Sequence, residues 1–514
     1  MDRKGWKGSI TVFFSLTCIL FLALICSTVE SARVQGARAQ TANITGMGTF
    51  SLLGEFEPGL LEKYGIFSLD VSYGSGSFEL DHVEQHLREF LMCNADPRQG
   101  IALPWSFDPW NLELTDSKIS GYALLTDEKG EPFYQQAVAY MKANLGSAAV
   151  SMLMESVRDA EKLETQQQEY EKRKRENDNE ISGMEEQKQQ RLEELESEAA
   201  ASADSAARGE ETTAVVPVEP PENPLQEIAR LRKMSVLEIV TWDKKISEKE
   251  IRKNGLPSKG RLKKGNFSVE KKYSGLTADV LFREYLLEHF SKYADQEGDS
   301  GLDYQIEYLL GGKTSDKDNL KYVVTRLLLL REGMNYIYCV QDTQMNAQAG
   351  GLATALTGFL GIPLLTSATK HALLLAWAYG ESLVDVRILL DGGKVPVAKD
   401  AESWALPLEK LAHITEILEQ GAKGSGRGLE YRDYLRMLLH MGSRTNQKIR
   451  ALDIIQMELQ TEKETKNFRA DHCMVAVRST AKWHCRPVFL RLPQVIMGIS
   501  AEDIGITQKS SMAY

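Results

Sequence analysis

Two carboxylates stand one helical turn apart in an apolar stretch of the C-terminal half. Glu381 and Asp385 belong to the segment ALLLAWAYGESLVDVR, and their spacing of four places both on one helix face. Paired carboxylates can act as acid and base in glycoside hydrolysis, but one helical turn holds this pair on a single side of a sugar bond. Charges in an apolar segment also need partners. We therefore expect a buried ion network completed by Arg326, Arg331 and Asn335, with catalysis as the alternative.

Two histidines share a spacing that zinc sites use. His82 and His86 lie four residues apart in a predicted helix, and such a pair can ligate zinc. The sequence places no third ligand beside them, and the Glu of an H-E-x-x-H motif is missing. We therefore assign no catalytic, cofactor-binding or metal-ligating residues, and we expect no cofactor.

The cysteines are few, and two of them recur beside histidine. The chain has six cysteines, which is too few for a disulfide scaffold. The pairs His472-Cys473 and His484-Cys485 lie on the two strands of a predicted hairpin. A zinc site, a cross-strand disulfide and two ordinary thiols are the three interpretations, and the ordinary thiols are the default.

The segment LLGGKTS, residues 309–315, is similar to a phosphate-binding loop. It places Gly-Gly-Lys-Thr between a predicted strand and a predicted helix. The motif requires a further glycine at the position that Glu307 occupies. We therefore expect no nucleotide binding, and a glycine turn followed by Thr314 or Ser315 as a helix N-cap.

Basic residues gather in residues 244–272, which contain eleven Lys and Arg. One interpretation is a loop that contacts phosphate-rich wall polymers or lipid headgroups. The other, which we prefer, is a solvated loop with ordinary charge scatter. The net charge of −11 argues against a general nucleic-acid binder.

Helix and strand patterns predict an α+β protein with two lobes and a spacer. Residues 41–155 predict a mixed α+β lobe, and residues 225–514 a mainly helical lobe with a few strands. Residues 156–224 predict a charged helical or disordered spacer, because their apolar residues are too sparse for a sustained coiled-coil seam and the segment ends in the linker AVVPVEPPENP.

The individual elements follow from hydrophobic periodicity. In the first lobe we predict strands at 65–70, 112–114 and 120–125, a turn at 127–130, and helices at 81–92 and 133–145. In the second lobe we predict strands at 236–242 and 302–310, a hairpin from 473–478 and 484–490, and helices at 319–340, 343–357, 368–390, 408–420, 428–441 and 446–460. The uncharged run Ala349–Thr369 is long enough to span a membrane, but its glycines and Pro363 favour a buried helical hairpin.

The N-terminal segment predicts a membrane anchor. No charged residue occurs from Gly8 to Val29, which is roughly 33 Å of helix and enough for a bilayer core. The run is too long for a signal-peptide core and lacks a small-residue cleavage site. Residues 1–40 therefore predict a single transmembrane helix that continues past the membrane, and the basic N-terminal flank favours a C-terminal bulk outside the cell.

Several segments together resemble a known family. They are GSITVFFSLTCILFLALICSTVESARVQGARAQ, LLEKYGIFSLDVSYG, DEKGEPFYQQAVAYMK, LDYQIEYLLGGKTSDKDNLKYVVTRLLLLREGMNYIY and LLLAWAYGESLVDVRILLDGGKVPV. The chain resembles an uncharacterised family of Gram-positive bacterial membrane-anchored proteins, whose N-termini are similar to TadE/TadG-like proteins of tight-adherence (Flp) pilus assembly. The resemblance implies a non-enzymatic envelope component, a pilus-assembly accessory or pseudopilin-like subunit, with pilus or secretion proteins as partners.

The start of the apolar run departs from the prepilin pattern at one position. The dipeptide KG before SITVFF resembles a prepilin leader that ends at Gly8, but such leaders have Glu where this chain has Phe13. An uncut anchor is therefore expected.

The alternative function is an extracytoplasmic enzyme that acts on cell-wall polymers, with Glu381 and Asp385 as its candidate residues.

Overall fold

The computed structural model describes residues 5–96, 110–207, 222–242, 244–251, 255–295, 301–421, 424, 426–489 and 504–514. Their contacts divide the chain into two units. Unit 1 comprises Met1–Tyr140, Lys253–Tyr273 and Ile455–Tyr514, and unit 2 comprises Met141–Arg252 and Ser274–Ile454. The expected α+β class is confirmed, because a mostly helical chain also forms a four-stranded antiparallel sheet.

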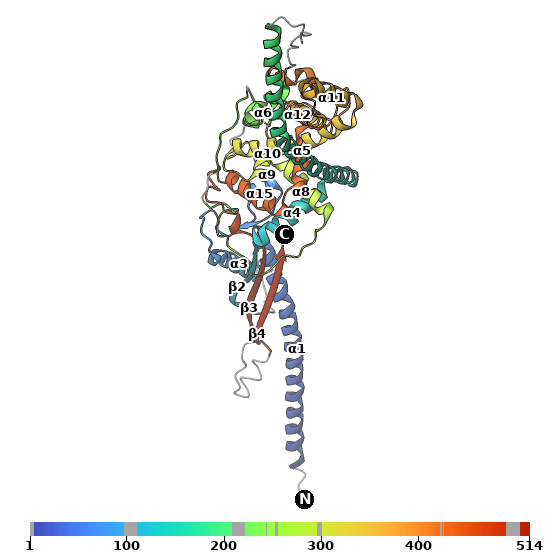
Figure 1. Ribbon diagram of the computed structural model, residues 1–514. Coiled ribbons are helices and arrows are strands. Elements are labelled where there is room, and N and C mark those ends of the chain that lie inside the picture. Colours follow the sequence, from blue (N-terminus) through green and yellow to red (C-terminus); the bar gives the residue numbers. More distant parts are fainter. Residues whose placement is uncertain are drawn as a thin grey trace. The chain divides into compact units, whose positions relative to one another are not determined.

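Unit 1 is built on one long helix. Helix α1 (Gly5–Leu53) has 49 residues without interruption, and Figure 1 shows it extending past the strands towards the N-terminus. From Ile10 to Val29 most of its side chains are exposed, whereas its second half buries residues such as Ala37 and Ile44 in the core. The expected continuation of the apolar helix into a globular part is therefore confirmed.

A strand near the C-terminus forms the centre of the sheet. Strand β3 (Cys473–Cys485) pairs antiparallel with β2 (Leu112–Leu124) along one edge. Strands β1 (Leu69–Asp70) and β4 (Ile504–Ala513) pair antiparallel with β3 as well. The two separate strands expected at 112–114 and 120–125 are one strand, in which shifts of register near Asp116 and Gly121 interrupt the apolar alternation.

The core of unit 1 lies between the second half of α1, helix α3 (Leu80–Ala95) and the sheet. Trp483 of β3 is fully buried there, and its indole Nε1 donates to the hydroxyl of Thr45 on α1 at 3.4 Å. Gly48 permits the close approach of α1 and α3, because a Cβ atom at this position would lie 2.7 Å from Leu91 Cδ2. The predicted helix at 81–92 is thus confirmed and covers α1.

Two shorter helices complete unit 1. They are α2 (Pro58–Tyr64) and α4 (Asp127–Asn144). The beginning of α4 contains Glu128, Lys129 and Gly130 with positive φ angles, so the turn expected at 127–130 is confirmed. The 3-10 helix η3 (Ala470–His472) precedes β3.

The hairpin expected from 473–478 and 484–490 is wrong. Both segments up to Cys485 belong to the single strand β3, because Ser479, Thr480 and Ala481 are buried and pair with β2 and β4 instead of forming a turn. Cys473 and Cys485 lie at opposite ends of this strand, roughly 40 Å apart at about 3.3 Å per residue. This separation excludes a disulfide or a shared zinc site between them, and neither cysteine forms a disulfide in the structure.

Thiol labelling without a reductant tests whether Cys473 and Cys485 are separate residues of one strand that no disulfide joins. We expect Cys473 to resist alkylation in the native protein, since burial raises the pKa of its thiol well above the usual value. Cys93 on α3 is exposed and serves as the labelled control. After denaturation, mass spectrometry should find Cys473 and Cys485 both alkylated. A disulfide-linked peptide that contains both cysteines would contradict their placement at opposite ends of one strand.

Unit 2 is a group of packed helices around α10 (Asp316–Gln341) and α12 (Pro363–Leu390). The other helices are α5 (Ser147–Ala207), α6 (Pro224–Leu231), α7 (Val236–Val240), α8 (Leu276–His289), α9 (Gln305–Gly311), α11 (Thr343–Thr357), η1 (Gly358–Leu360), η2 (Leu408–His413), α13 (Ile414–Gln420), α14 (Tyr431–Met441) and α15 (Arg444–Leu459), which continues into unit 1. The helices expected between 319 and 460 are all present.

The strands expected at 236–242 and 302–310 are wrong, because the first forms α7 and the second contains most of α9. Short apolar runs that are buried on all sides do not distinguish a strand from one or two turns of helix. The uncharged run 349–369 forms a bend between α11 and α12, which pack together as the expected hairpin. Its bend is not buried, since Phe359 and Leu364 are exposed.

The charged segment expected to be a spacer belongs to unit 2. It is helical, as predicted, but α5 packs against α8, α10, α12 and α14. Its sparse apolar and polar residues reach the core, where Tyr170, Asn177 and Met184 are buried. The Pro-rich linker predicted up to residue 224 lies mainly at 208–221, outside the described residues.

Candidate functional site

The two carboxylates singled out in the sequence lie inside unit 2. The Oδ2 atom of Asp385 accepts from Arg331 Nε at 3.0 Å and from Asn335 Nδ2 at 2.9 Å. Lys399 Nζ lies 2.6 Å from Glu381 Oε1 and 2.7 Å from Asp385 Oδ1, the second contact being an ion pair without hydrogen-bond geometry. The Glu381 and Asp385 side chains have no exposed surface. Two cations therefore balance two anions in a closed network.

This network also binds the segment 396–406, which follows α12, to helices α10 and α12. Glu381 accepts from the backbone N–H groups of Ala405 and Leu406 at 2.9 and 2.8 Å. Arg331 Nη1 donates to the carbonyls of Pro396 and Val397 at 2.9 and 3.0 Å. Because the Glu381 and Asp385 side chains have no exposed surface, neither carboxylate faces a surface that a wall polymer could reach.

The surroundings of the two carboxylates shift their pKa values in opposite directions. Burial, together with the Asp385 carboxylate, raises the pKa of Glu381 above its usual value. Burial also acts to raise the pKa of Asp385, but the charges of Arg331 and Lys399 outweigh it and hold that pKa below the usual value. Asp385 is thus the anion that the two cations stabilise.

The expected partners are partly correct. Arg331 and Asn335 contact Asp385, whereas Arg326 does not belong to the network and lines a cavity instead. Lys399 was missed, because it lies in an irregular segment after α12 where no periodic pattern indicates its direction.

The segment LLGGKTS forms the turn between α9 and α10. Gly312 ends α9 in the left-handed conformation with φ 62°, and the Ser315 side chain caps α10 by accepting from Asp318 N. The expected glycine turn with Ser315 as N-cap is confirmed. A Cβ atom at Gly312 would lie 2.4 Å from Arg450 Cζ, so a larger residue there would have to displace the Arg450 guanidinium.

Glu307, at the position where a phosphate-binding loop needs glycine, is fully buried. Its Oε1 atom accepts from the Tyr431 hydroxyl at 2.7 Å and from Tyr293 N at 3.0 Å, while Oε2 has no hydrogen-bond partner in the described part of the chain. Burial raises the pKa of Glu307 to about 7, although these hydrogen bonds act to lower it. Glu307 therefore titrates near neutral pH.

The remaining sequence candidates have ordinary surroundings. His86 Nδ1 lies 2.9 Å from Glu55 Oε2 and its ring packs against Tyr73, whereas His82 is exposed. Over the described part of the chain, no three His, Cys, Asp or Glu residues gather in a way that could hold a metal ion.

Part of the basic segment 244–272 covers the outer edge of strand β2. Asn266 N donates to the Tyr122 carbonyl at 3.0 Å, and Asn266 Oδ1 accepts from Tyr122 N at 2.7 Å. Lys271 pairs with Glu128 at 2.6 Å, and in unit 2 Lys249 pairs with Asp303 at 2.7 Å. These residues protect a sheet edge and form local ion pairs, so they are not a free cationic loop.

The junction between the exposed and buried halves of α1 is fixed by an ion pair. Glu30 and Arg33 are buried and lie 2.6 Å apart. Arg33 donates to the carbonyls of Trp110 and Arg486, at 2.7 and 2.6 Å, which lie at the end of the sheet where β2 begins and β3 ends. Glu30 Oε2 accepts from the N–H groups that follow β3, at Val488 and Phe489. This junction holds α1 and the sheet as one body.

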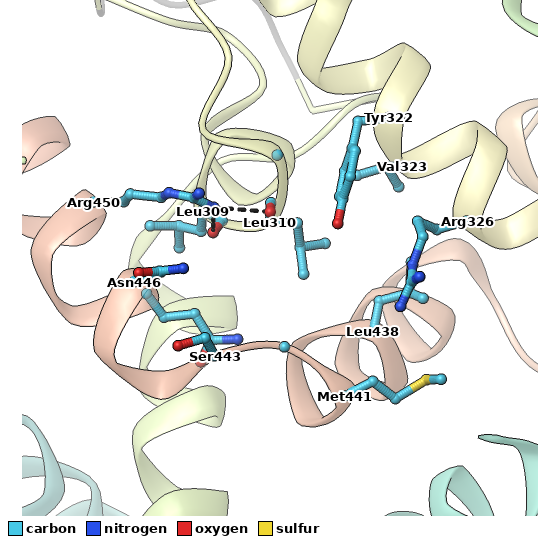
Figure 2. Close-up of a pocket in the computed structure, with 13 residues that line it drawn as sticks. Leu309, Leu310, Tyr322, Val323, Arg326, Leu438, Met441, Ser443, Asn446 and Arg450 are labelled. Carbon is cyan, nitrogen blue, oxygen red and sulfur yellow. Dashed lines mark hydrogen bonds between the residues drawn. The ribbon is translucent and has the colours of Figure 1, made fainter. Parts of the chain in front are cut away.

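A cavity of about 310 Å³ opens in unit 2 (Figure 2). The end of α9, the middle of α10, the end of α14 and the start of α15 form its walls. Its polar lining consists of Tyr322, Arg326, Ser443, Asn446, Gln447 and Arg450. No Asp or Glu of the described residues lines the cavity. Sequence patterns missed it, because residues from four separate elements form it.

Comparison with known proteins places most of unit 2 in a family. A family of unknown function (DUF5702) matches residues 216–485 of the 514-residue chain. The chain belongs to this family. No curated protein and no solved structure matches it.

The DUF5702 match contains both candidate sites of unit 2. The network around Asp385 and every residue that lines the cavity lie within residues 216–485. Helix α1 lies before the matched region. The similarity of the N-terminus to TadE/TadG-like proteins therefore stays a prediction.

Proposed function

We propose that this DUF5702 protein is a membrane-anchored, non-enzymatic component of the cell envelope that acts as an accessory or pseudopilin-like subunit in pilus assembly. The observation that carries the proposal is the continuity of α1. One helix joins an apolar segment long and apolar enough to cross a membrane with the core of unit 1. Pilins and pseudopilins combine an apolar N-terminal helix with a globular part in this way.

The exposed half of α1 supports a partner of low polarity. Residues from Ile10 to Ile25 include many exposed large side chains, among them Phe13, Phe14, Leu20 and Phe21. Such a surface on one projecting helix needs lipid or other apolar helices around it. A pseudopilin-like subunit uses both, since its helix lies in the membrane before assembly and against neighbouring helices afterwards.

The junction at Glu30 and Arg33 supports a role in which α1 transmits a force or a displacement to unit 1. Because Arg33 binds the segments just before β2 and just after β3, a displacement of the helix moves the sheet of unit 1 with it. The flanking charges support an extracytoplasmic location for the bulk of the chain. Three basic residues precede the apolar run, namely Arg3, Lys4 and Lys7. After the run, Arg33 is neutralised by its ion pair with Glu30, so Arg38 is the next basic residue on that side.

In-cell photocrosslinking tests this proposal. A photoreactive phenylalanine analogue at Phe13 or Phe21, both exposed on α1, should crosslink to proteins of a pilus or secretion apparatus. The same analogue at Trp242, exposed in unit 2, controls for random collision. Failure to recover any such protein from Phe13 and Phe21, in cells that are assembling the pilus, would contradict the proposed role.

A further inference from the structure

The cavity in unit 2 has cationic side chains on opposite walls. Figure 2 shows Arg450 and Asn446 on one side, from α15, and Tyr322 and Arg326 on the other, from α10. Lys313 and Lys321, together with Asp318, border an adjoining hollow that shares Tyr322 and Arg326 with the cavity. Although the chain has a net charge of −11, the cavity itself is lined by two arginines and by no carboxylate of the described residues, which favours an anionic ligand.

Arg326 is available to a ligand. It is half-buried and makes no hydrogen bond or ion pair with any residue that the structure describes. Its position on α10 is well defined, because the neighbouring Val323 and Leu327 are fully buried in the core. A guanidinium held at a cavity wall without an internal partner is suited to bind an anion from solution.

Arg450 is held in place by backbone atoms. Its Nη1 atom donates to the carbonyls of Leu309 and Leu310, each at 2.8 Å, and its guanidinium lies against Gly312. Burial lowers the pKa of Arg450, although Tyr308, Tyr322 and Asp453 act to raise it. Its hydrogen-bond partners are neutral carbonyls, so an anion in the cavity would supply a charge of opposite sign.

Two further groups in the cavity indicate the kind of anion. Helix α15 begins at Arg444, and its first turn contributes Asn446 to the lining, so the positive end of a 16-residue helix faces this region. Gln447 is 1% exposed, and its amide Nε2 donates to the Leu439 carbonyl at 2.7 Å. The Gln447 Oε1 atom has no hydrogen-bond partner among the residues that the structure describes, and this buried acceptor needs a donor such as a hydroxyl group.

We propose that the cavity binds a phosphate ester that carries a hydroxyl group, such as a phosphorylated polyol or sugar. The phosphate lies between Arg326 and Arg450 near the start of α15, and a ligand hydroxyl donates to Gln447 Oε1. The cavity volume of about 310 Å³ is sufficient for a ligand of this size. The site is independent of the role proposed for α1, because all of its residues lie in unit 2.

Calorimetric titration of the full-length protein in detergent with glycerol 3-phosphate tests the site. We expect binding that weakens with added salt, and no binding of glycerol. Arg326→Gln should weaken the affinity about tenfold or more, because a hydrogen bond between charged groups is lost. Arg432→Gln removes an exposed arginine of α14 that lines neither hollow, and it should leave the affinity unchanged.

Two comparisons complete the test. Inorganic phosphate should bind more weakly than glycerol 3-phosphate, since it lacks the carbon-borne hydroxyl that Gln447 would accept. Nanodiscs of phosphatidylglycerol, compared with phosphatidylcholine, show whether a lipid headgroup supplies the same chemistry. Binding of neither glycerol 3-phosphate at millimolar concentration nor phosphatidylglycerol would overturn the proposal. Equal affinities of the Arg326→Gln and Arg432→Gln proteins would overturn it too, provided that both melt at the temperature of the unmodified chain.

Discussion

Replacement of Arg331 by methionine is expected to lower the free energy of unfolding by about 3–5 kcal/mol. Arg331 is fully buried and donates to Asp385, to the carbonyls of Pro396 and Val397, and to the Tyr434 hydroxyl. Its loss leaves Lys399 alone to balance Glu381 and Asp385, so one negative charge stays buried without compensation. Denaturant unfolding followed by circular dichroism measures the change.

Arg326→Met is the matched control for this substitution. Both arginines lie on α10, but Arg326 makes no hydrogen bond or ion pair among the described residues. Its replacement should change the free energy of unfolding by no more than about 0.5 kcal/mol. Equal effects of the two substitutions would contradict the structural role of the network. A wall-hydrolysing activity that disappears in a well-folded Glu381→Gln, Asp385→Asn protein would restore the enzymatic alternative.

The second large effect is a pH dependence that arises from Glu307. Its pKa is raised to about 7 in the folded protein, mainly by burial, against about 4.3 in an unfolded chain. The folded state therefore binds more protons than the unfolded state between these two values. The resulting contribution to stability is present in full below the unfolded pKa, and it is lost as the pH rises towards 7. We expect the loss to reach about 3 kcal/mol.

Glu307→Gln isolates this effect. The amide keeps an acceptor for the Tyr431 hydroxyl and cannot ionise. Its free energy of unfolding should match that of the unmodified protein near pH 4.5 and exceed it at pH 8 by up to about 3 kcal/mol. Glu248→Gln, at an exposed glutamate of unit 2, is the control and should follow the unmodified protein at both values. Parallel stability profiles for Glu307→Gln and the unmodified protein from pH 4.5 to 8 would show that Glu307 does not titrate there.

Local signals in the sequence predicted the helical part of this fold well. Helix α1 has no proline and only one internal glycine, Gly36, between Gly8 and Gln40, and Ser315 has the hydroxyl that caps α10. Each feature depends on neighbours within one or two turns, which the sequence displays directly. The partners Arg331 and Asn335 could be named for the same reason, since their spacing of four places them on one face of α10.

Tertiary contacts account for what the sequence did not reveal. Lys399 lies beyond the end of α12, in a segment whose direction is set by the loop that returns to Glu381. Strand β3 passes through Ser479 and Thr480, and their burial between β2 and β4 replaces the turn that the sequence suggested. The cavity around Arg326 and Arg450 joins residues that are 124 positions apart, so no local pattern could indicate it.

The mature N-terminus of the protein tests the central claim, that α1 stays in the working protein and joins a membrane to unit 1. Mass spectrometry of the protein extracted from cell membranes should find a first residue at Met1 or Asp2. A first residue at Ser9 would keep the apolar helix and would mean that the chain is processed like a prepilin. A first residue between Ser27 and Gln40 would contradict the account, because the apolar half of α1 would then be a discarded signal.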